Sequence, residues 1–330
     1  MAAKNFFIYF LIMLLTVYPA SAGGVNLNRW VLNVTLQDSG LVEEVIQAEI
    51  ENVGPSQLDG FSFEVPASGV RIIYDFDHTS SFTGQVVEQQ TISGKTKITV
   101  NFNSSVEAGK KWDGRIGFTA ENWVAKAGPD YSIDIPIEAP QAIVSGKNTA
   151  ISVSPDADIR AQVFFPKGVE VTLATPQPFR ILFQYGHMVP TWSPDKMHIG
   201  DKLSIKGSFS SSLNKIVETD DKIRSLSSRI KEAKNQGKNV SDAEIHLRNA
   251  EDYNTNMALA AFWEKREQDV LSNVGYANDE IKLAEDSLSA MGSQESPQTT
   301  VTAGKKSPGF EAPVLITMMA LYLFLRKRKY

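Results

Sequence analysis

The sequence predicts a multidomain protein with two antiparallel β-sandwich domains, at residues 23–138 and 139–211, followed by an α-helical bundle or coiled-coil hairpin at residues 212–291. Three observations lead to this fold class. Short runs with alternating apolar residues fill residues 25–210 and are separated by Gly, Pro, Asn and Asp. After Ser212, apolar residues recur at spacings of three, four or seven, as on one face of a helix. The length of 330 residues is typical of two or three domains.

The N-terminal segment, residues 1–22, reads as a secretory signal peptide. Lys4 precedes an apolar run from Phe6 to Val17, and the small residues around Ala22 form a cleavage site. A retained membrane helix is the alternative, but the run is shorter than the roughly 20 residues that a span requires. We therefore expect cleavage after Ala22.

The strongest strand candidates are rich in β-branched residues and alternate in polarity. They lie at residues 30–36, 45–50, 70–74 and 96–102. No helical pattern of 10 to 15 residues separates them, which favours an antiparallel sandwich over βαβ units.

A possible internal duplication supports two domains rather than one. Phe63–Pro66 leads to Gly69, and Phe164–Pro166 leads to Gly168 in the same way. We interpret this as two related sandwiches joined near residues 136–140; one larger, irregular β domain is the alternative. In its segments Glu51–Pro55 and Phe63–Pro66 the first domain resembles the lumenal β domains of ribophorin-type subunits and archaeal surface β-sandwiches, a resemblance that carries no function.

The helical region begins with an apolar stripe that ends at Asn235–Asn239. Ser241 lies three residues before Glu244, a capping box that predicts the start of a second helix. The stripe then continues for about twice the length of the first helix. A break near residues 273–275 would give a third helix and a compact antiparallel bundle; a long two-helix coiled coil remains open.

The C-terminal segment combines a spacer with a sorting signal. Residues 292–307 are Ser/Thr-rich and predict a stalk. Residues 308–330 contain Pro308-Gly309-Phe310, a short apolar helix and a basic end at Arg326–Lys329. This order resembles the PGF-CTERM signal of archaeal cell-surface proteins. The resemblance implies an archaeosortase-like processing enzyme, attachment to a membrane lipid, and a location on the outer face of the cytoplasmic membrane. A tail-anchoring transmembrane helix is the alternative.

The charge distribution agrees with export and argues against nucleic acid as a partner. Of the formal charge of −5, residues 1–22 contribute +1 and residues 310–330 contribute +3, so residues 23–309 carry −9. An acidic body offers no electrostatic footprint for nucleic acid. The absence of cysteine excludes disulfides, thiolate metal sites and cysteine nucleophiles.

Three glycosylation sequons begin at Asn33, Asn103 and Asn239. Asn239 is the best candidate because it lies in the turn between two predicted helices. Asn33 lies in a predicted strand between Leu32 and Val34, which places it on the opposite and solvated face.

Other candidate groups are less specific. Carboxylates at alternate positions, which could bind a divalent cation, occur as Asp75 with Asp77 and as Asp156 with Asp158. Polar turns between strands are the favoured explanation of both pairs. A ligand platform could use Trp123, Trp192 or Trp263, for which packing is the competing role. We expect no catalytic residue, metal or cofactor.

These observations favour a non-enzymatic, membrane-anchored cell-surface protein that acts in envelope structure, adhesion or partner recognition. An extracytoplasmic accessory subunit of a membrane complex, which docks envelope or membrane-complex proteins through its helices, is the alternative. A secreted hydrolase with carboxylate chemistry is the third class.

Overall fold

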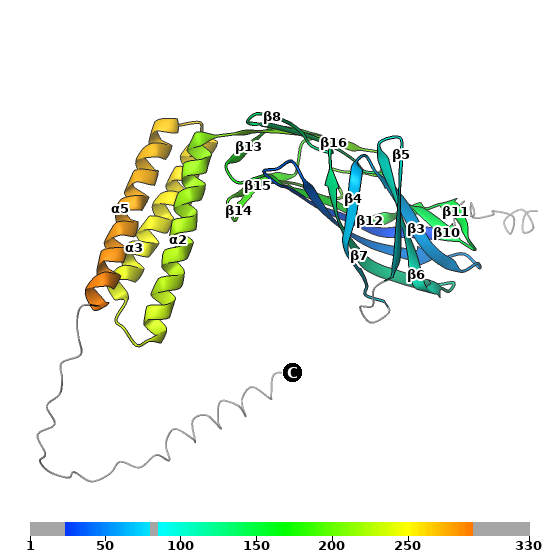
Figure 1. Ribbon diagram of the computed structural model, residues 1–330, viewed down its shortest axis with the longest axis horizontal. Coiled ribbons are helices and arrows are strands. Elements are labelled where there is room, and N and C mark those ends of the chain that lie inside the picture. Colours follow the sequence, from blue (N-terminus) through cyan, green and yellow to red (C-terminus); the bar gives the residue numbers. More distant parts are fainter. Residues whose placement is uncertain (1–23, 80–84, 293–330) are drawn as a thin grey trace, which may run out of the picture. The chain divides into compact units, whose positions relative to one another are not determined.

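The fold is known from a computed structural model that describes residues 24–79 and 85–292. Sixteen strands of the described chain form three sheets (Figure 1). The largest sheet has the strand order β14-β15-β12-β1-β2-β7-β4. The other two sheets have the orders β11-β10-β3-β6-β5 and β13-β16-β9-β8.

The strands have the following bounds. The first half of the β region contains β1 (Val25–Leu36), β2 (Val42–Asn52), β3 (Leu58–Val65), β4 (Ser68–Asp77), β5 (Val86–Ile92), β6 (Lys95–Val106), β7 (Lys110–Glu121) and β8 (Ala125–Ala127). The second half contains β9 (Asp130–Pro136), β10 (Gln141–Val144), β11 (Lys147–Ala150), β12 (Ser152–Phe164), β13 (Val169–Thr175), β14 (Arg180–Gln184), β15 (His187–Trp192) and β16 (Lys202–Phe209).

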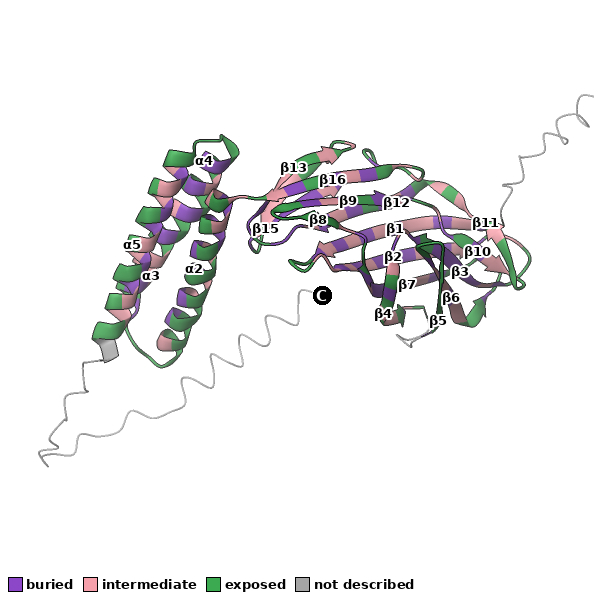
Figure 2. Ribbon diagram, turned by 45° about the horizontal axis from the view of Figure 1, so that its top comes forward, coloured by how far each residue is buried: buried purple, intermediate pink, exposed green. Residues whose placement is uncertain are grey.

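The local sequence explains the central strands well. Along β1 and β2, buried and partly exposed residues alternate almost without interruption (Figure 2). The pleat of a strand points successive side chains to opposite faces, so the apolar positions of both strands meet on one side of the sheet. Trp30, Leu32, Ile46 and Ile50 of this face are at most 3% exposed.

The prediction of two antiparallel sandwich domains is wrong. β1 pairs in parallel with β12, and Arg29 lies opposite Asp158 in this register. β9 pairs with β16, and β10 pairs with β3. Strands on both sides of the expected boundary at residue 138 therefore share all three sheets, and one hydrophobic cluster extends from Val25 to Ile205.

The apparent duplication explains why the prediction failed. Phe63 lies in β3 of the five-stranded sheet, whereas Phe164 lies in β12 of the seven-stranded sheet. The two similar segments therefore occupy different places in the fold. Alternation predicts where a strand forms, but it does not specify the partner strand.

The helical segment contains α2 (Ser211–Asn235), α3 (Ser241–Glu251), the π-helix η1 (Asp252–Ala258), α4 (Leu259–Trp263) and α5 (Glu267–Gly292). The Oγ atom of Ser210 caps α2 by accepting a hydrogen bond from the backbone N–H of Leu213 at 3.3 Å. The expected Ser241 cap is absent, because α3 begins at Ser241 itself and Val240 is its N-cap without a side-chain hydrogen bond.

The expectation of a separate helical bundle or hairpin also needs correction. α2, α3 and α5 lie side by side (Figure 1), but their buried cluster also includes Met188 of β15. Ile181 and Phe183 of β14 pack against the same cluster. The helices therefore complete an apolar core with strands. The short apolar helix expected at the C-terminus lies outside the described residues, as do the signal peptide, most of the stalk and the sorting signal.

The break between the last helices is nearer the N-terminus than the sequence suggested. It falls at residues 264–266, where Lys265 has a positive φ of 59°. Gly275 lies within α5, and a Cβ atom added there would meet nothing within 4 Å. One glycine in a helix costs only about 1 kcal/mol, so it does not stop the helix.

The shared sheets predict that residues 23–138 do not fold alone. In a fragment that contains only these residues, β1 would lack β12, β9 would lack β16 and β3 would lack β10. Circular dichroism and proton–nitrogen correlation spectra should show no cooperative unfolding and little dispersion. The longer fragment 23–292 is the control and should unfold cooperatively. A stable, well-dispersed 23–138 fragment would contradict the shared-sheet architecture.

Candidate functional site

The residues predicted at the chain ends cannot be placed. Ala22, Pro308, Gly309 and Phe310 lie outside the described residues. Within residues 24–79 and 85–292, no helix is both long and apolar enough to cross a membrane.

The three sequon asparagines lie on separate elements and do not form one site. Asn103 in β6 and Asn239, two residues before α3, are exposed. The Oδ1 atom of Asn239 accepts hydrogen bonds from the backbone N–H of Ser241 at 3.3 Å and from its Oγ at 2.8 Å. Asn33 in the middle of β1 is half-buried, and its Oδ1 accepts a hydrogen bond from Nε2 of Gln162. Glycosylation at the three positions stays a prediction.

Three of the four paired carboxylates take part in local contacts, and Asp156 is exposed. Asp75 accepts a hydrogen bond from the backbone N–H of Gln85, and Asp77 accepts one from Thr79 at 2.9 Å. Asp158 forms an ion pair with Arg160 at 2.5 Å. Across the described residues, no three His, Asp or Glu side chains gather closely enough to hold a metal ion.

The three tryptophans have different roles. The indole N–H of Trp192 donates to the carbonyl of Pro176 at 2.9 Å, and its ring is 2% exposed, so it is a core residue. Trp263 at the end of α4 is 43% exposed. Trp123 donates its N–H to the carbonyl of Asp134 at 2.9 Å and presents its ring to a cavity.

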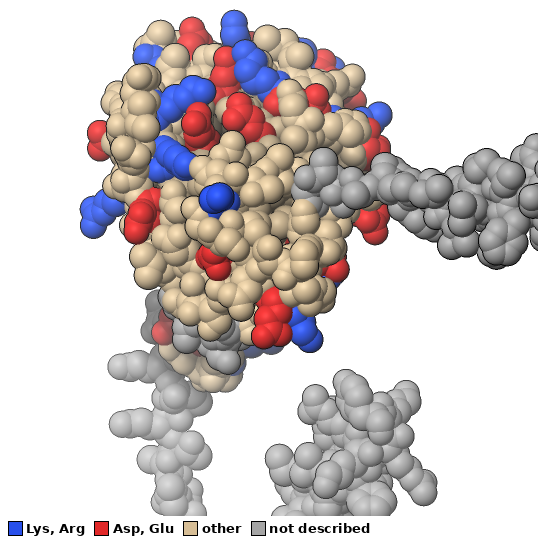
Figure 3. Space-filling view, turned by 90° about the vertical axis from the view of Figure 1, so that its right-hand side faces the viewer, with Lys and Arg blue, Asp and Glu red and all other residues tan. Residues whose placement is uncertain are grey.

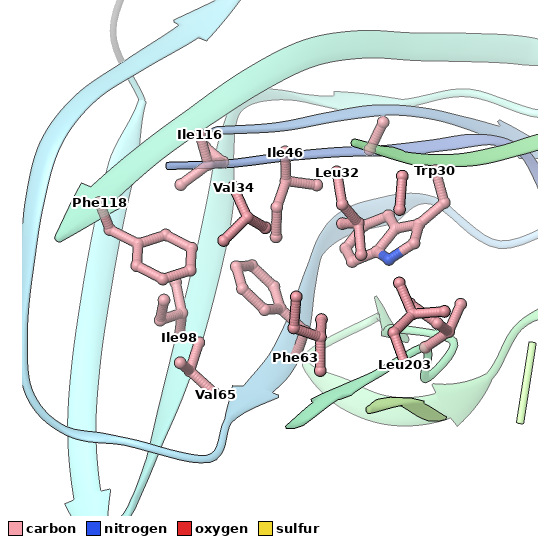
Figure 4. Close-up of a cluster of buried hydrophobic side chains, with 14 of the residues drawn as sticks. Trp30, Leu32, Val34, Ile46, Phe63, Val65, Ile98, Ile116, Phe118 and Leu203 are labelled. Carbon is pink, nitrogen blue, oxygen red and sulfur yellow. The ribbon is translucent and has the colours of Figure 1, made fainter. Parts of the chain in front are cut away.

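This cavity, of about 260 Å³, lies where the three sheets meet. Its walls come from β1 and β2 of the largest sheet, from β3, β6 and β10 of the five-stranded sheet, and from β9 of the four-stranded sheet. The larger apolar side chains of the wall are Trp30, Leu32, Ile46, Phe63, Val65, Trp123 and Ile135. In Figure 4, Trp30, Leu32 and Ile46 face Phe63 and Val65 across the cluster. The volume is at the small end for ligand sites and suits one small group or one side chain.

Glu44 is the unusual residue of this cavity. It lies on the apolar face of β2, opposite Val34 of β1 and Phe118 of β7, and it is 3% exposed. No hydrogen bond or ion pair joins its carboxyl to another residue within the described ranges, although it lines the cavity. Burial raises the pKa of Glu44 to about 8, so the side chain is mostly protonated at pH 7.

The remaining charged residues of the cavity lie at its edge. Glu64 and Glu138 are exposed, so the cavity reaches solvent on their side. Lys97 lies opposite Glu64 in the β3–β6 ladder and is half-buried. The lining thus contains three carboxyl groups and one cation. A site of this kind can bind through a buried carboxyl and aromatic faces.

On the face drawn in Figure 3, acidic and basic side chains are intermixed. On the seven-stranded sheet, Arg29 pairs with Glu49 and Asp113, both at 3.4 Å, and Lys111 pairs with Glu49 at 2.9 Å. The lysine and asparagine hydrogen bonds, together with the two nearby cations, hold the pKa of Glu49 below its usual range despite partial burial.

The sequence contains a signal for Glu44 that the motif search missed. Val42, Ile46, Ala48 and Ile50 alternate along one face of the strand, and Glu44 interrupts that face. A charged residue at a core position of a strand is unusual enough to mark a site. The rest of the cavity could not be found this way, because its lining depends on how three sheets meet.

Comparisons with known proteins do not identify a family. No protein-family model matches the chain, and no curated protein matches it. Among solved structures, an M1 zinc metallopeptidase from Deinococcus radiodurans aligns at 12% identity and a TM-score of 0.34, and leukotriene A4 hydrolase from Saccharomyces cerevisiae at 10% and 0.34. The alignments cover 56% of this chain but only 42% and 29% of those proteins. At these TM-scores the similarity carries no weight for the fold or function of this chain.

The burial of Glu44 predicts how stability depends on pH. Between pH 4.5, the ordinary pKa, and about pH 8, the folded state keeps a proton that the unfolded state releases. The free energy of unfolding should therefore fall as pH rises through this window, by about 1.4 kcal/mol per pH unit at its steepest. Urea unfolding of the wild type and Glu44→Gln measures this effect. Relative to the variant, the free energy of unfolding of the wild type should decrease by roughly 3 kcal/mol between pH 5.5 and 8.5.

The matched control is Glu43→Gln, on the opposite face of the same strand. This variant should keep the wild-type decrease in stability with pH. If Glu44→Gln and the wild type show parallel pH profiles, the carboxyl of Glu44 is not buried as described.

Proposed function

We propose that this chain is an exported, membrane-anchored protein of the cell surface that recognises a partner without catalysing a reaction. The single observation that supports recognition is the cavity around Glu44, which combines aromatic walls with a buried and unpaired carboxyl. Such a group lowers stability in the free protein, and a ligand that pairs with it removes that disadvantage.

The proposal of export and anchoring rests on the two ends of the sequence. Residues 1–22 have the pattern of a signal peptide, and residues 308–330 resemble an archaeal sorting signal. The charge of −9 between residues 23 and 309 keeps an exported body soluble at the membrane surface.

An accessory role in a membrane complex is the second candidate, and the helical surface favours it. Large apolar side chains are exposed on four successive helical elements. They are Ile245 on α3, Met257 on η1, Trp263 on α4, and Tyr276 and Leu283 on α5, all at least 42% exposed. A partner subunit that covers them would bury apolar area that now faces water.

Two experiments distinguish the recognition protein, the accessory subunit and the secreted hydrolase from one another. Purification from membranes in mild detergent should retain stoichiometric membrane subunits if the accessory role is correct, and it should yield the chain without such subunits if the first proposal is correct. Incubation with glycan and peptide panels should give binding without turnover. Turnover that survives rigorous purification would contradict both non-enzymatic readings.

The proposed processing predicts the termini of the mature protein. Mass spectrometry of membrane-extracted protein should find Gly23 at the N-terminus and no peptide containing the basic residues 326–329. Proteases added to intact cells should cleave the β region, because it faces outward. Detection of an intact Tyr330 would contradict C-terminal processing, and protection from protease would contradict surface exposure.

A further inference from the structure

We infer that the cavity around Glu44 receives a primary ammonium group carried on an aliphatic chain. This inference rests on the proposed recognition function and names the chemical class of its ligand. It is argued from three features of the cavity: the unpaired carboxyl, the balance of charge and the nature of the walls.

The carboxyl of Glu44 needs a hydrogen-bond donor. The side chain is 97% buried and lines the cavity, and no other described residue donates a hydrogen bond to it or pairs with it. A buried carboxylate without a partner is strongly unfavourable, so Glu44 keeps its proton in the free protein, whereas a charge-assisted hydrogen bond to the carboxylate is among the strongest available to proteins. An ammonium group brings three donors and the opposite charge.

The balance of charge favours a cation over an anion. The charged or titratable groups that line the cavity are Glu44 from β2, Glu64 from β3, Lys97 from β6 and Glu138 after β9. The lining residues from β1, β9 and β10 carry no charge. An anion would face the carboxyl groups of Glu44, Glu64 and Glu138; Glu64 pairs with Lys95 at 3.5 Å and lies opposite Lys97.

The walls favour an organic cation over a bare metal ion. A divalent metal requires about six oxygen ligands, and among the described residues no three acidic or histidine side chains lie closely enough together to hold a metal ion. The rings of Trp30, Phe63 and Trp123 instead present π-systems that attract an ammonium group. Leu32 and Ile46 can cover the methylene groups that follow it.

Calorimetric titration of the full-length protein in detergent with n-butylammonium tests the inference, with 1-butanol as the uncharged control. The ammonium ion should bind at least tenfold more tightly than the alcohol. Glu44→Gln should weaken ammonium binding at least tenfold, and Glu43→Gln should leave it within twofold. Trp123→Leu should weaken it several-fold by removing one aromatic wall.

Proton release distinguishes pairing with Glu44 from adsorption at the rim. Because burial raises the pKa of Glu44 to about 8, binding at pH 7 must expel its proton. Titrations in buffers of different ionisation enthalpy should show nearly one proton released per ligand at pH 7 and nearly none at pH 9. The apparent affinity should rise about tenfold between these two values.

Two further probes identify the source of the ammonium group. Tighter binding of Nα-acetyl-lysine N-methylamide would assign the cavity to a lysine side chain of a protein partner. Tighter binding of cadaverine would assign it to a free diamine. Either result supports an aliphatic ammonium ligand.

The inference is overturned if Glu44→Gln, shown by urea unfolding to be folded, binds butylammonium as tightly as the wild type, or if 1-butanol binds equally well. Failure of the broader proposal has a different signature. A correctly processed surface protein that does not bind ammonium would overturn the ligand class alone. Ammonium binding by a chain that cells retain internally would overturn the location alone.

Discussion

The parallel pairing of β1 with β12 is the contact on which the β region depends. It joins residues more than a hundred positions apart, such as Arg29 and Asp158, and makes β1 an interior strand of a seven-stranded sheet. A sheet of that size needs cover for its apolar face. The two smaller sheets supply it, and each of them also combines strands from both halves of the region. The cavity exists because three twisted sheets cannot fill the space where they meet.

Glu44 lines this cavity and lowers the stability of the fold. A leucine there would fit a wall already made of Leu32, Ile46 and Phe63, and replacement of a buried charge by an apolar residue is often neutral or stabilising. The strand tolerates this residue because the carboxyl group of Glu44 stays mostly protonated, and therefore uncharged, at neutral pH. Stability lost at one position for the sake of binding is common in functional sites. The helices also contain residues that do not favour stability, because Trp263 and Tyr276 expose apolar area to water.

Local patterns in the sequence predicted strands better than they predicted the fold. The segments 30–36, 45–50 and 96–102 all lie within strands, because alternation is a property of neighbouring residues. Pairing is not local, and a short repeated Phe-Pro-Gly pattern suggested two equivalent domains where the structure has one interleaved set of sheets. For the same reason, Glu44 could have been recognised from its own strand. Its cavity partners Trp123 and Glu138 lie in segments that only the tertiary fold brings near it.

The order of strands along the chain also determines when the largest sheet can be completed during synthesis. β1 leaves the ribosome well before its parallel partner β12, which follows only after about 125 further residues, or roughly 6 to 25 s at ordinary elongation rates. During that interval one edge of β1 lacks its hydrogen-bond partner and can pair with another chain. A nascent polypeptide of this kind gains from being held by a chaperone until β12 has been made. The late closure of the sheet therefore favours folding of this region after, rather than during, its synthesis.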